Sequence, residues 1–510
     1  MLRKRLMLDE SSIACGRVYL HIASLGYHEL YVNKERVGDH VLQPAVSQLD
    51  KRALRVDYDI TGYVHEGDNE IVIMTGQGWG RVYGTPAAVQ AKLTRRITDD
   101  LAEVIEETDS TWQTSPSPYS YTGSWLPLQF GGERYDARAN EKWRPASVYD
   151  AKNILVTPQE FGGNRIVDTV APVEWISHNK TSMLLDFGRV VTGWAQIDFP
   201  PMPEGTEMLI TYLDNLQSEY KETDIYIARG RGEERFSNRF HTHSFRYISI
   251  QTAYTDIQLS RIKARALQIS AVDPKGGATF WCNDERLNAI HDMVKYTLCC
   301  LTFSGYMVDC PHLERMGYGG DGNASTMTLQ TMWDVSATYR NWMTAWGDAM
   351  EPDGELPYVA PAYRTGGGPY WSSFIIQAPW RTYLNYGDTL LIAEHYSRMK
   401  RWLDFIERNS SDGLLQPWPD NERHTWFLGD WLAPEGVDIG GESVLHVNNC
   451  VISECLADME RMALLLGGAE RRRLSLLSGE DLMPPYIAAS TTPKPTPTQT
   501  APPWTRPTPC

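Results

Sequence analysis

The chain has little cysteine, no paired cysteine motif and no long hydrophobic run. Its 510 residues include 8 cysteines without a CxxC pair, and only Cys299 and Cys300 are adjacent. This pattern favours reduced thiols in a cytosol over a disulfide framework. No segment is apolar and long enough to span a membrane, and the basic N-terminus lacks the apolar run of a signal peptide. We therefore expect a cytoplasmic protein without a membrane partner.

Basic residues are also scarce. The chain has 48 Lys and Arg against 64 Asp and Glu, which gives a net charge of −16. Such a charge disfavours a nucleic-acid partner and suits a neutral substrate. Aromatic residues, in contrast, are plentiful, with 17 Trp and 26 Tyr. Aromatic faces stack on sugar rings as readily as on each other, although we expect most of them in the core.

Alternating hydrophobic residues predict strands over the first half of the chain, which is long enough overall for two to four domains. Short strands are predicted around residues 18–22, 30–32, 71–74, 183–187, 195–199, 208–212 and 245–250. Residues 115–144 are rich in Pro, Ser, Gly and Tyr and indicate an irregular connection. Many short strands with Gly and Pro turns are typical of antiparallel sandwiches. We expect one β-sandwich with this connection in residues 1–150 and a second in 151–275.

From about residue 283 the hydrophobic spacing changes to three and four, the period of a helix. We interpret four stripes as helix cores, the first with Asn283 or Asp284 as its cap. The stripes are Leu287, Ile290, Met293, Val294 and Leu298; Leu329, Met332, Trp333, Ser336, Tyr339, Met343 and Trp346; Ile392, Tyr396, Met399, Leu403 and Ile406; and Ile452, Cys455, Met459, Met462 and Leu466. Acidic and aromatic loops are predicted at 353–355, 366–371, 378–380 and 429–432. The pattern indicates an all-α array in 276–475 whose loops gather at one end.

Residues 309–321 combine Asp309, Glu314, Arg315, Tyr318 and Asp321 in a glycine-rich turn. A solvated loop is the ordinary interpretation for any single carboxylate here, but the whole cluster favours a site. Paired carboxylates of differing pKa are the standard equipment of glycoside hydrolysis. A phosphate-binding interpretation fits poorly, because no strand precedes the glycines, no Lys-Ser/Thr follows them, and the acidic neighbours would repel phosphate.

His241 and His243 could bind a metal together, but the sequence offers no further ligand near them. Two strand histidines that face the same side of a sheet explain the spacing equally well. We prefer this interpretation and expect neither a metal nor a cofactor.

The motif Asp309-Cys-Pro, followed by Glu314-Arg-x-Gly-aromatic-x-Gly320-Asp321, resembles the signature of bacterial α-L-rhamnosidases, glycoside hydrolase family 78. Other segments look like the same family. Residues 26–33 and 76–79 resemble its N-terminal β-sandwich, residues 186–188, 192–194 and 245–247 its second, concanavalin-like sandwich, and residues 429–432 a loop of its catalytic domain. The resemblance covers residues from about 10 to 470. It implies two β-sandwiches followed by an (α/α)6 barrel, in agreement with the helical stripes.

The resemblance also assigns roles by position. Glu314 matches the general acid, which needs a raised pKa from burial or from a nearby negative charge. Asp309 and Asp321 could supply that charge, and they match residues that bind the rhamnose hydroxyls. Arg315 is expected to pair with a carboxylate, to hold its geometry and to take part in substrate binding. Tyr318 stands where the family commonly has Trp.

Three further positions are carried over to the sugar pocket. Trp371 and Trp431 match residues that line it, and Asp430 is a candidate beside them. The family inverts configuration, which requires a second carboxylate as general base. That base is a Glu in the C-terminal part of the family's barrel, and we find no counterpart for it.

Fewer residues follow position 276 than a full barrel needs, since twelve helices of about 11–12 residues with functional loops require well over about 300. Residues 476–510 are rich in Pro and Thr and are expected to be a disordered tail. We therefore expect a chain truncated at its C-terminus, with the acid but without the base, and an impaired hydrolysis of terminal non-reducing α-L-rhamnose from rhamnosides. Another inverting (α/α)6 glycosidase and a non-catalytic carbohydrate-binding protein stay open as alternatives, and so does a homodimer.

Overall fold

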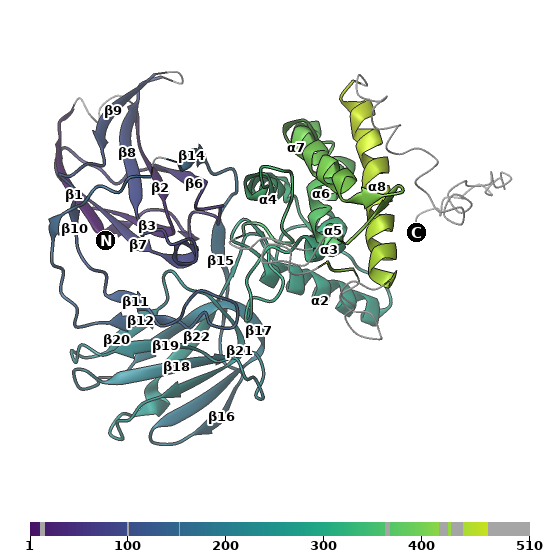
Figure 1. Cartoon of the computed structure of the whole chain (residues 1–510). Coiled ribbons are helices and arrows are strands. Elements are labelled where there is room, and N and C mark those ends of the chain that lie inside the picture. Colours follow the sequence, from purple (N-terminus) through teal and green to yellow (C-terminus); the bar gives the residue numbers. More distant parts are fainter. Residues whose placement is uncertain are drawn as a thin grey trace, which may run out of the picture.

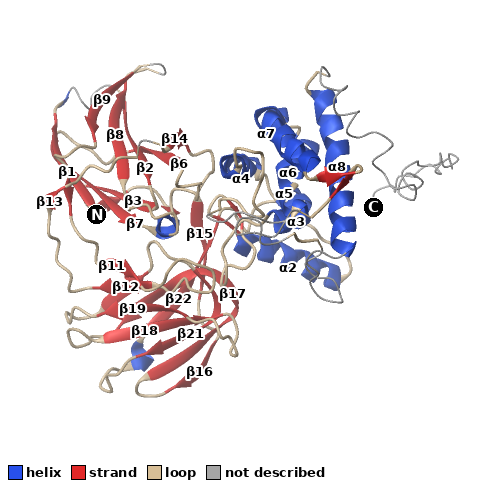
Figure 2. Ribbon diagram, viewed as in Figure 1, coloured by secondary structure: helices blue, strands red, loops and turns tan. Residues whose placement is uncertain are grey.

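The computed structural model of the chain describes residues 1–10, 16–98, 101–151, 153–362, 368–417, 427–429 and 442–467. Two β domains precede a helical domain, and all three meet at the centre of the molecule (Figure 1). Strands occupy the N-terminal half and helices the C-terminal half (Figure 2). The predicted class, two β domains followed by part of an (α/α)6 barrel, is therefore confirmed.

The first β domain packs two sheets around a core that includes Val18, Leu20 and Ile22, all fully buried. The alternation that predicted this strand is thus the alternation of core and outer faces. One sheet has the order β13 (Arg144–Pro145), β10 (Gln113–Thr114), β1 (Leu2–Leu8), β7 (Gly67–Gly76), β3 (Tyr27–Val32) and β4 (Glu35–Arg36). The other has the order β14 (Leu155–Pro158), β6 (Arg52–Asp59), β2 (Arg17–Ser24), β8 (Val89–Arg96) and β9 (Ala102–Glu107).

The second β domain is built on the 18-residue strand β17 (Ser182–Phe199), which joins the two predicted strands at 183–187 and 195–199. Its sheet has the order β11 (Tyr119–Tyr121), β12 (Glu133–Asp136), β19 (Glu222–Ile227), β18 (Glu207–Leu213), β21 (His243–Gln251), β17, β22 (Lys263–Ser270), β15 (Asn164–Val170) and β5 (His40–Val41), and β16 (Glu174–His178) and β20 (Glu234–Ser237) also pair with β17. The region 115–144 is therefore not wholly irregular, because β11 and β12 belong to this sheet. The pairs β12–β19 and β14–β6 are parallel, so neither domain is purely antiparallel.

The helical domain contains six long helices among the described residues. They are α2 (Glu285–Leu301), α3 (Gly319–Met332), α4 (Ser336–Ala349), α6 (Phe374–Tyr386), α7 (Thr389–Arg408) and α8 (Glu442–Leu465). The domain also contains the short helix α5 (Pro369–Ser372) and two hairpins, β23 (Thr302–Phe303)–β24 (Tyr306–Met307) and β25 (Ser410–Ser411)–β26 (Leu414–Leu415). The β domains contain the 3-10 turns η1 (Gly78–Arg81) and η2 (Leu259–Arg261). Asp284 caps α2 by accepting a hydrogen bond from the backbone N–H of Arg286. No helix in the described part of the chain combines the length and the apolar character that crossing a membrane requires.

Four predictions for the helical region were wrong in detail. One is the loop at 366–371, because residues 369–371 belong to the short helix α5. The second stripe spans two helices, because α3 ends at Met332 and α4 begins at Ser336. The N–H and the hydroxyl of Ser336 both donate to the carboxylate of Asp334. Residues 378–380 lie inside α6 despite Pro379, since Ala378 and its neighbours pack in the core. The first stripe is not core along its whole length: Leu287, Ile290 and Met293 are 49%, 52% and 60% exposed.

The β domains hold the helical domain by polar contacts. Arg52 of β6 forms an ion pair with Asp348 of α4, with Nε to Oδ2 at 2.5 Å. The Gln48 side chain donates to the carbonyl of Ala362 at 2.6 Å and accepts its N–H at 3.0 Å. The core of the helical domain is also continuous with Tyr27, Trp79 and other aromatic residues of the first β domain. The first β domain and the helical domain are therefore joined both by polar contacts and by a shared core.

Candidate active site

Residues 309–318 of the acidic segment form a closed loop between β24 and α3, and residues 319–321 form the start of α3. The N–H of Asp309 donates to the carbonyl of Met316, and the N–H of Glu314 donates to the carbonyl of Cys310. The end of the loop pairs with a neighbouring strand-like segment through a bridge between Tyr318 and Val359. The loop is therefore held on both sides, and α3 begins directly after it at Gly319.

This loop brings the predicted carboxylates together. Side-chain atoms of Asp309, Cys310 and Glu314 lie within 4.8 Å of one another. Asp321 joins them from the first turn of α3, close enough for its charge to act on Asp309. The motif predicted this meeting of carboxylates on the condition that the segment before the helix forms a loop, and that condition is met.

The cluster holds a proton at a pH where isolated carboxyl groups are ionised. Burial is the largest cause of the raised pKa of Asp309, which is about 7. A hydrogen bond from Cys310 Sγ at 2.7 Å opposes this rise, and the charge of Glu314 adds to it. Burial and, after it, the charge of Glu314 also raise the pKa of Asp321. Near neutral pH the cluster therefore keeps a carboxyl proton beside Glu314.

Stability should depend on pH through Asp309. Its pKa is raised from 3.8 to about 7 by folding, so the folded state binds the proton more tightly than the unfolded state does. This contribution is fully present below pH 3.8 and is lost as the pH rises through about 7. Between pH 4 and 8 the free energy of unfolding of the unchanged protein should therefore fall by an amount on the order of a few kcal/mol because of Asp309. We expect the Asp309→Asn variant to lack this fall. Urea unfolding of both proteins at several pH values measures this, and parallel curves for the two would contradict it.

Aromatic side chains border the cluster. The Tyr318 ring stacks on Tyr358, with centroids 5.6 Å apart and planes 14° from parallel. Burial and a hydrogen bond with Glu314 raise the pKa of Tyr318, so its hydroxyl stays protonated. Trp371 is only 7% exposed and packs against the glycines at the start of α3. Asp430 and Trp431 lie outside the described residues, so their predicted roles remain predictions.

The start of α3 has no room for a side chain at Gly319. A Cβ there would lie 2.0 Å from the carbonyl oxygen of Trp371, which is backbone and cannot rotate away. We expect Gly319→Ala to lower the free energy of unfolding by about 1–3 kcal/mol through overpacking and to weaken any sugar binding. Gly62→Ala is the control, because a Cβ at Gly62 meets nothing within 4 Å. Thermal melts compare the two variants, and equal melting points would contradict the expectation.

Arg315 points away from the carboxylates of its own loop. Its guanidinium is 2% exposed and donates to both carboxylate oxygens of Glu222 at 2.5 Å. Its Nε donates to the carbonyl of Pro311, and its Cζ lies 4.1 Å from the centroid of the Phe130 ring. Arg315 does pair with a carboxylate, as expected, but with one from the second β domain. In this structure it anchors the loop and is almost fully buried, and its predicted place among the substrate-binding residues stays a prediction.

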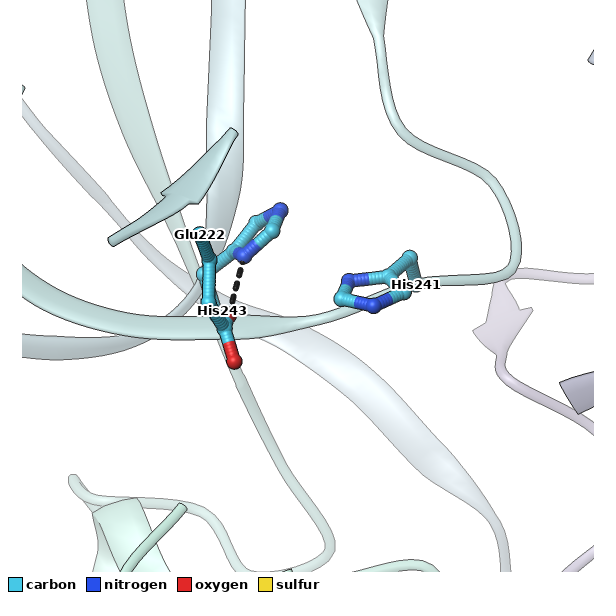
Figure 3. A group of neighbouring side chains, drawn as sticks. All are labelled: Glu222, His241 and His243. Carbon is cyan, nitrogen blue, oxygen red and sulfur yellow. Dashed lines mark hydrogen bonds and ion pairs between the residues drawn. The ribbon is translucent and has the colours of Figure 1, made fainter. Parts of the chain in front are cut away.

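His241 and His243 lie on the same anchor. His243 opens β21 and contacts Glu222 at 2.5 Å and Asp224 at 3.1 Å, and the His241 ring lies beside it (Figure 3). Burial disfavours the charge of His243, yet Asp224 and Glu222 raise its pKa to about 9. Burial and Arg315 lower the pKa of His241. Only His243 is in a strand, so the expectation of two strand histidines was half wrong.

Two groups of side chains have the composition of metal ligands. In the first, Glu222 with both histidines, the carboxylate already balances Arg315 and protonated His243, and a cation would have to displace them. In the second, Asp309, Cys310 and Glu314, burial and the neighbouring Asp309 raise the pKa of the Cys310 thiol, which keeps it protonated. Glu222 and His243 of the first group are therefore engaged with each other and with Arg315, whereas Nδ1 of His241 is buried without a hydrogen-bond partner.

Family models match nearly the whole chain. Residues 14–175 match the α-L-rhamnosidase N-terminal domain, 176–268 the bacterial α-L-rhamnosidase concanavalin-like domain, and 275–474 the bacterial α-L-rhamnosidase six-hairpin glycosidase domain. The chain belongs to the bacterial α-L-rhamnosidases, a family of glycoside hydrolases. The resemblance carried by residues 309–321 is thereby confirmed at the level of the family.

Characterised relatives agree with this assignment. The chain is 28% identical over 471 residues to an α-L-rhamnosidase of Formosa agariphila, covering 81% of this chain and 47% of that protein. It is 26% identical to an α-L-rhamnosidase of Streptomyces avermitilis, covering 84% of this chain and 43% of that protein. The solved α-L-rhamnosidase from Dictyoglumus thermophilum superposes with a TM-score of 0.81 at 26% identity, over 94% of this chain and 55% of that one. The chain thus spans about half the length of the relatives it matches.

Two residues of this region escaped the sequence analysis. Tyr358 stacks on Tyr318, and Glu222 neutralises Arg315. Tyr358 lies near the predicted loop 353–355 but carries no motif. Glu222 stands 93 positions before Arg315, and no local pattern marks it as a partner.

Proposed function

We propose that the chain acts on rhamnosides and hydrolyses terminal non-reducing α-L-rhamnose with inversion of configuration. The observation that carries the proposal is the meeting of Asp309 and Glu314, from the loop before α3, with Asp321 from the first turn of that helix, where burial raises the pKa of Asp309 to about 7. Glycoside hydrolysis needs such a proton reserve, because the leaving oxygen is a poor leaving group until it is protonated.

In this proposal Glu314 donates the proton to the glycosidic oxygen. Side-chain oxygens of Asp309 and Glu314 lie within 4.8 Å of each other, so the proton that burial holds on Asp309 limits the negative charge beside the proposed acid. Asp309 and Asp321 also accept hydrogen bonds from sugar hydroxyls, since a carboxylate offers several acceptor sites. Tyr318, hydrogen-bonded to Glu314, borders the acid on its aromatic side. The rhamnose specificity is supported by a structural relative, the Streptomyces avermitilis enzyme, which was solved in complex with L-rhamnose.

Inversion also needs a base, about 6.5–9.5 Å from the acid across a water molecule. We assign this role to no described residue. The proposal therefore includes a slow hydrolysis of the same rhamnoside substrates.

The direct test incubates the 510-residue chain with an aryl α-L-rhamnoside and with a rhamnose-terminated disaccharide. We expect release of rhamnose whose first-formed anomer, followed by proton NMR, is inverted, at a rate below that of a full-length relative. Panels of other aryl glycosides separate this activity from that of another inverting glycosidase. Calorimetric binding of rhamnose that persists after Glu314→Gln, with no turnover by the unchanged chain, would favour a carbohydrate-binding protein instead.

We also propose a cytoplasmic location. Cys299 and Cys300 are buried as free thiols, and burial raises the pKa of both, which makes them slow to oxidise. Titration of thiols in the protein isolated from its native host tests this. A homodimer stays a proposal for sedimentation analysis.

A further inference from the structure

A cleft of about 490 Å³ opens where the two β domains meet the loop of the candidate active site. Its wall is formed by residues 122–124 and 128–131, by residues 220–222 at the start of β19, and by His312 of the active-site loop. Arg81 at the end of η1 completes it. The volume is that of a site for one or two sugar rings. His312 stands two positions before Glu314, so the cleft and the proposed acid share one loop.

The segment 122–131 is held in an unusual conformation. Trp125 and Leu128 have φ values of 59° and 66°, which are rare for residues with side chains. Trp125 is buried and packs edge-on against Trp79 at 5.6 Å, so the core maintains the strained backbone. The Leu128 N–H then donates to the carbonyl of Leu313 at 2.8 Å, directly before Glu314. Strain of this kind persists where the surroundings enforce it, often beside binding sites.

The cleft offers positive charge on a strongly acidic protein. Arg81 and Lys221 are exposed, and neither forms an ion pair with a carboxylate among the residues that the structure describes. Glu222 also borders the cleft, but Arg315 and protonated His243 already neutralise it. His312 also lines the cleft, and its Nε2 lies 3.7 Å from a carboxylate oxygen of Asp214. An anionic group is therefore the ligand that this cleft favours.

We infer that the cleft binds an anionic sugar residue, a hexuronate by preference, on the leaving-group side of the bond that Glu314 protonates. The inference rests on the proposed function for the position of the rhamnose. The recognition of the anion depends only on the cleft. The carboxylate accepts hydrogen bonds from Arg81 and Lys221, while exposed Leu128 and Tyr220, at 52% and 42%, offer apolar faces to the sugar rings.

The test measures calorimetric binding of a rhamnosyl-hexuronate disaccharide and of its carboxyl-reduced, neutral counterpart to the intact chain at low salt. We expect the acidic sugar to bind roughly tenfold more tightly. The double variant R81A/K221A should lose this preference to within about twofold, and added salt should weaken it in the unchanged protein. The control K180A/R231A removes two exposed cations of the second β domain that do not border the cleft, and it should keep the preference.

Equal affinity for the acidic and the neutral disaccharide, or a preference that survives R81A/K221A, would overturn the inference. A hexuronate oligomer without rhamnose probes the cleft alone, whereas hydrolysis of a neutral aryl rhamnoside probes the proposed function alone, so the two can fail separately. A sulfated sugar in the same series separates a general anion site, in which it binds as tightly, from a carboxylate site, in which it binds more weakly. Thermal melts verify that the exposed substitutions leave the fold intact.

Discussion

Replacing Glu314 with Gln is expected to lower kcat for a rhamnose disaccharide by a factor on the order of 10³. Gln has nearly the same shape as Glu and preserves the contact with Tyr318, but it has no proton to give to the leaving oxygen. The carboxyl proton that burial holds on Asp309 cannot replace it fully, because protonation requires a group positioned at the glycosidic oxygen. Initial rates of rhamnose release by the two proteins measure the effect.

The leaving group gives this prediction its specificity. The nitrophenolate group of a nitrophenyl rhamnoside leaves without protonation. The rate of hydrolysis of this substrate should therefore fall much less than that of the disaccharide. Glu285→Gln serves as the control, since Glu285 is an exposed carboxylate in the first turn of α2, away from the loop. A loss that is equal for both substrates would show that Glu314 acts in binding or folding and not as the acid.

The periodicity of the sequence predicted most of the secondary structure because it reports which face of an element is buried. This worked for β2, α7 and α8, whose faces are covered by the core. It failed for α3 and α4, because residues 333–335 leave the helical conformation and interrupt the stripe, although Leu329, Tyr339 and Met343 on either side of the break are buried. It also failed for α6, where packing keeps Pro379 in a helix against its own preference.

The candidate site divides in the same way. A local motif sufficed for the carboxylates, because Asp309 and Glu314 stand in one short loop and Asp321 stands in the helical turn that directly follows it. The anchor could not be predicted, since Arg315 finds its partner on β19 and the arrangement of three domains decides which carboxylate that is. Likewise the spacing of Leu287, Ile290 and Met293 identified a helix but not whether another element covers that face.

Replacing Glu222 with Ala is expected to lower the free energy of unfolding by about 3–5 kcal/mol, the effect of removing one partner of a buried ion pair. Arg315 would keep its charge in a site with 2% exposure, and it would lose the carboxylate that accepts two of its hydrogen bonds. The Pro311 carbonyl, the Phe130 ring and a 3.4 Å contact with Nε2 of His241 would remain. Protonated His243 would lose a partner at 2.5 Å at the same time. Chemical denaturation at pH 7 measures the loss.

A double-mutant cycle separates the charge from the packing. The variant Glu222→Leu with Arg315→Met removes both charges, and we expect it to recover most of the lost stability, since a well-packed apolar pair often replaces a buried ion pair without cost. Asp198→Asn is the control for an exposed pair, because its partner Arg235 is 61% exposed, and it should change stability by less than about 1 kcal/mol. Arg315 adjoins Glu314, so we expect Glu222→Ala also to weaken the binding of rhamnose. This weakening should exceed the part that is explained by the smaller fraction of folded protein. Unchanged stability after Glu222→Ala would mean that the loop is held by its own hydrogen bonds and not by the second β domain.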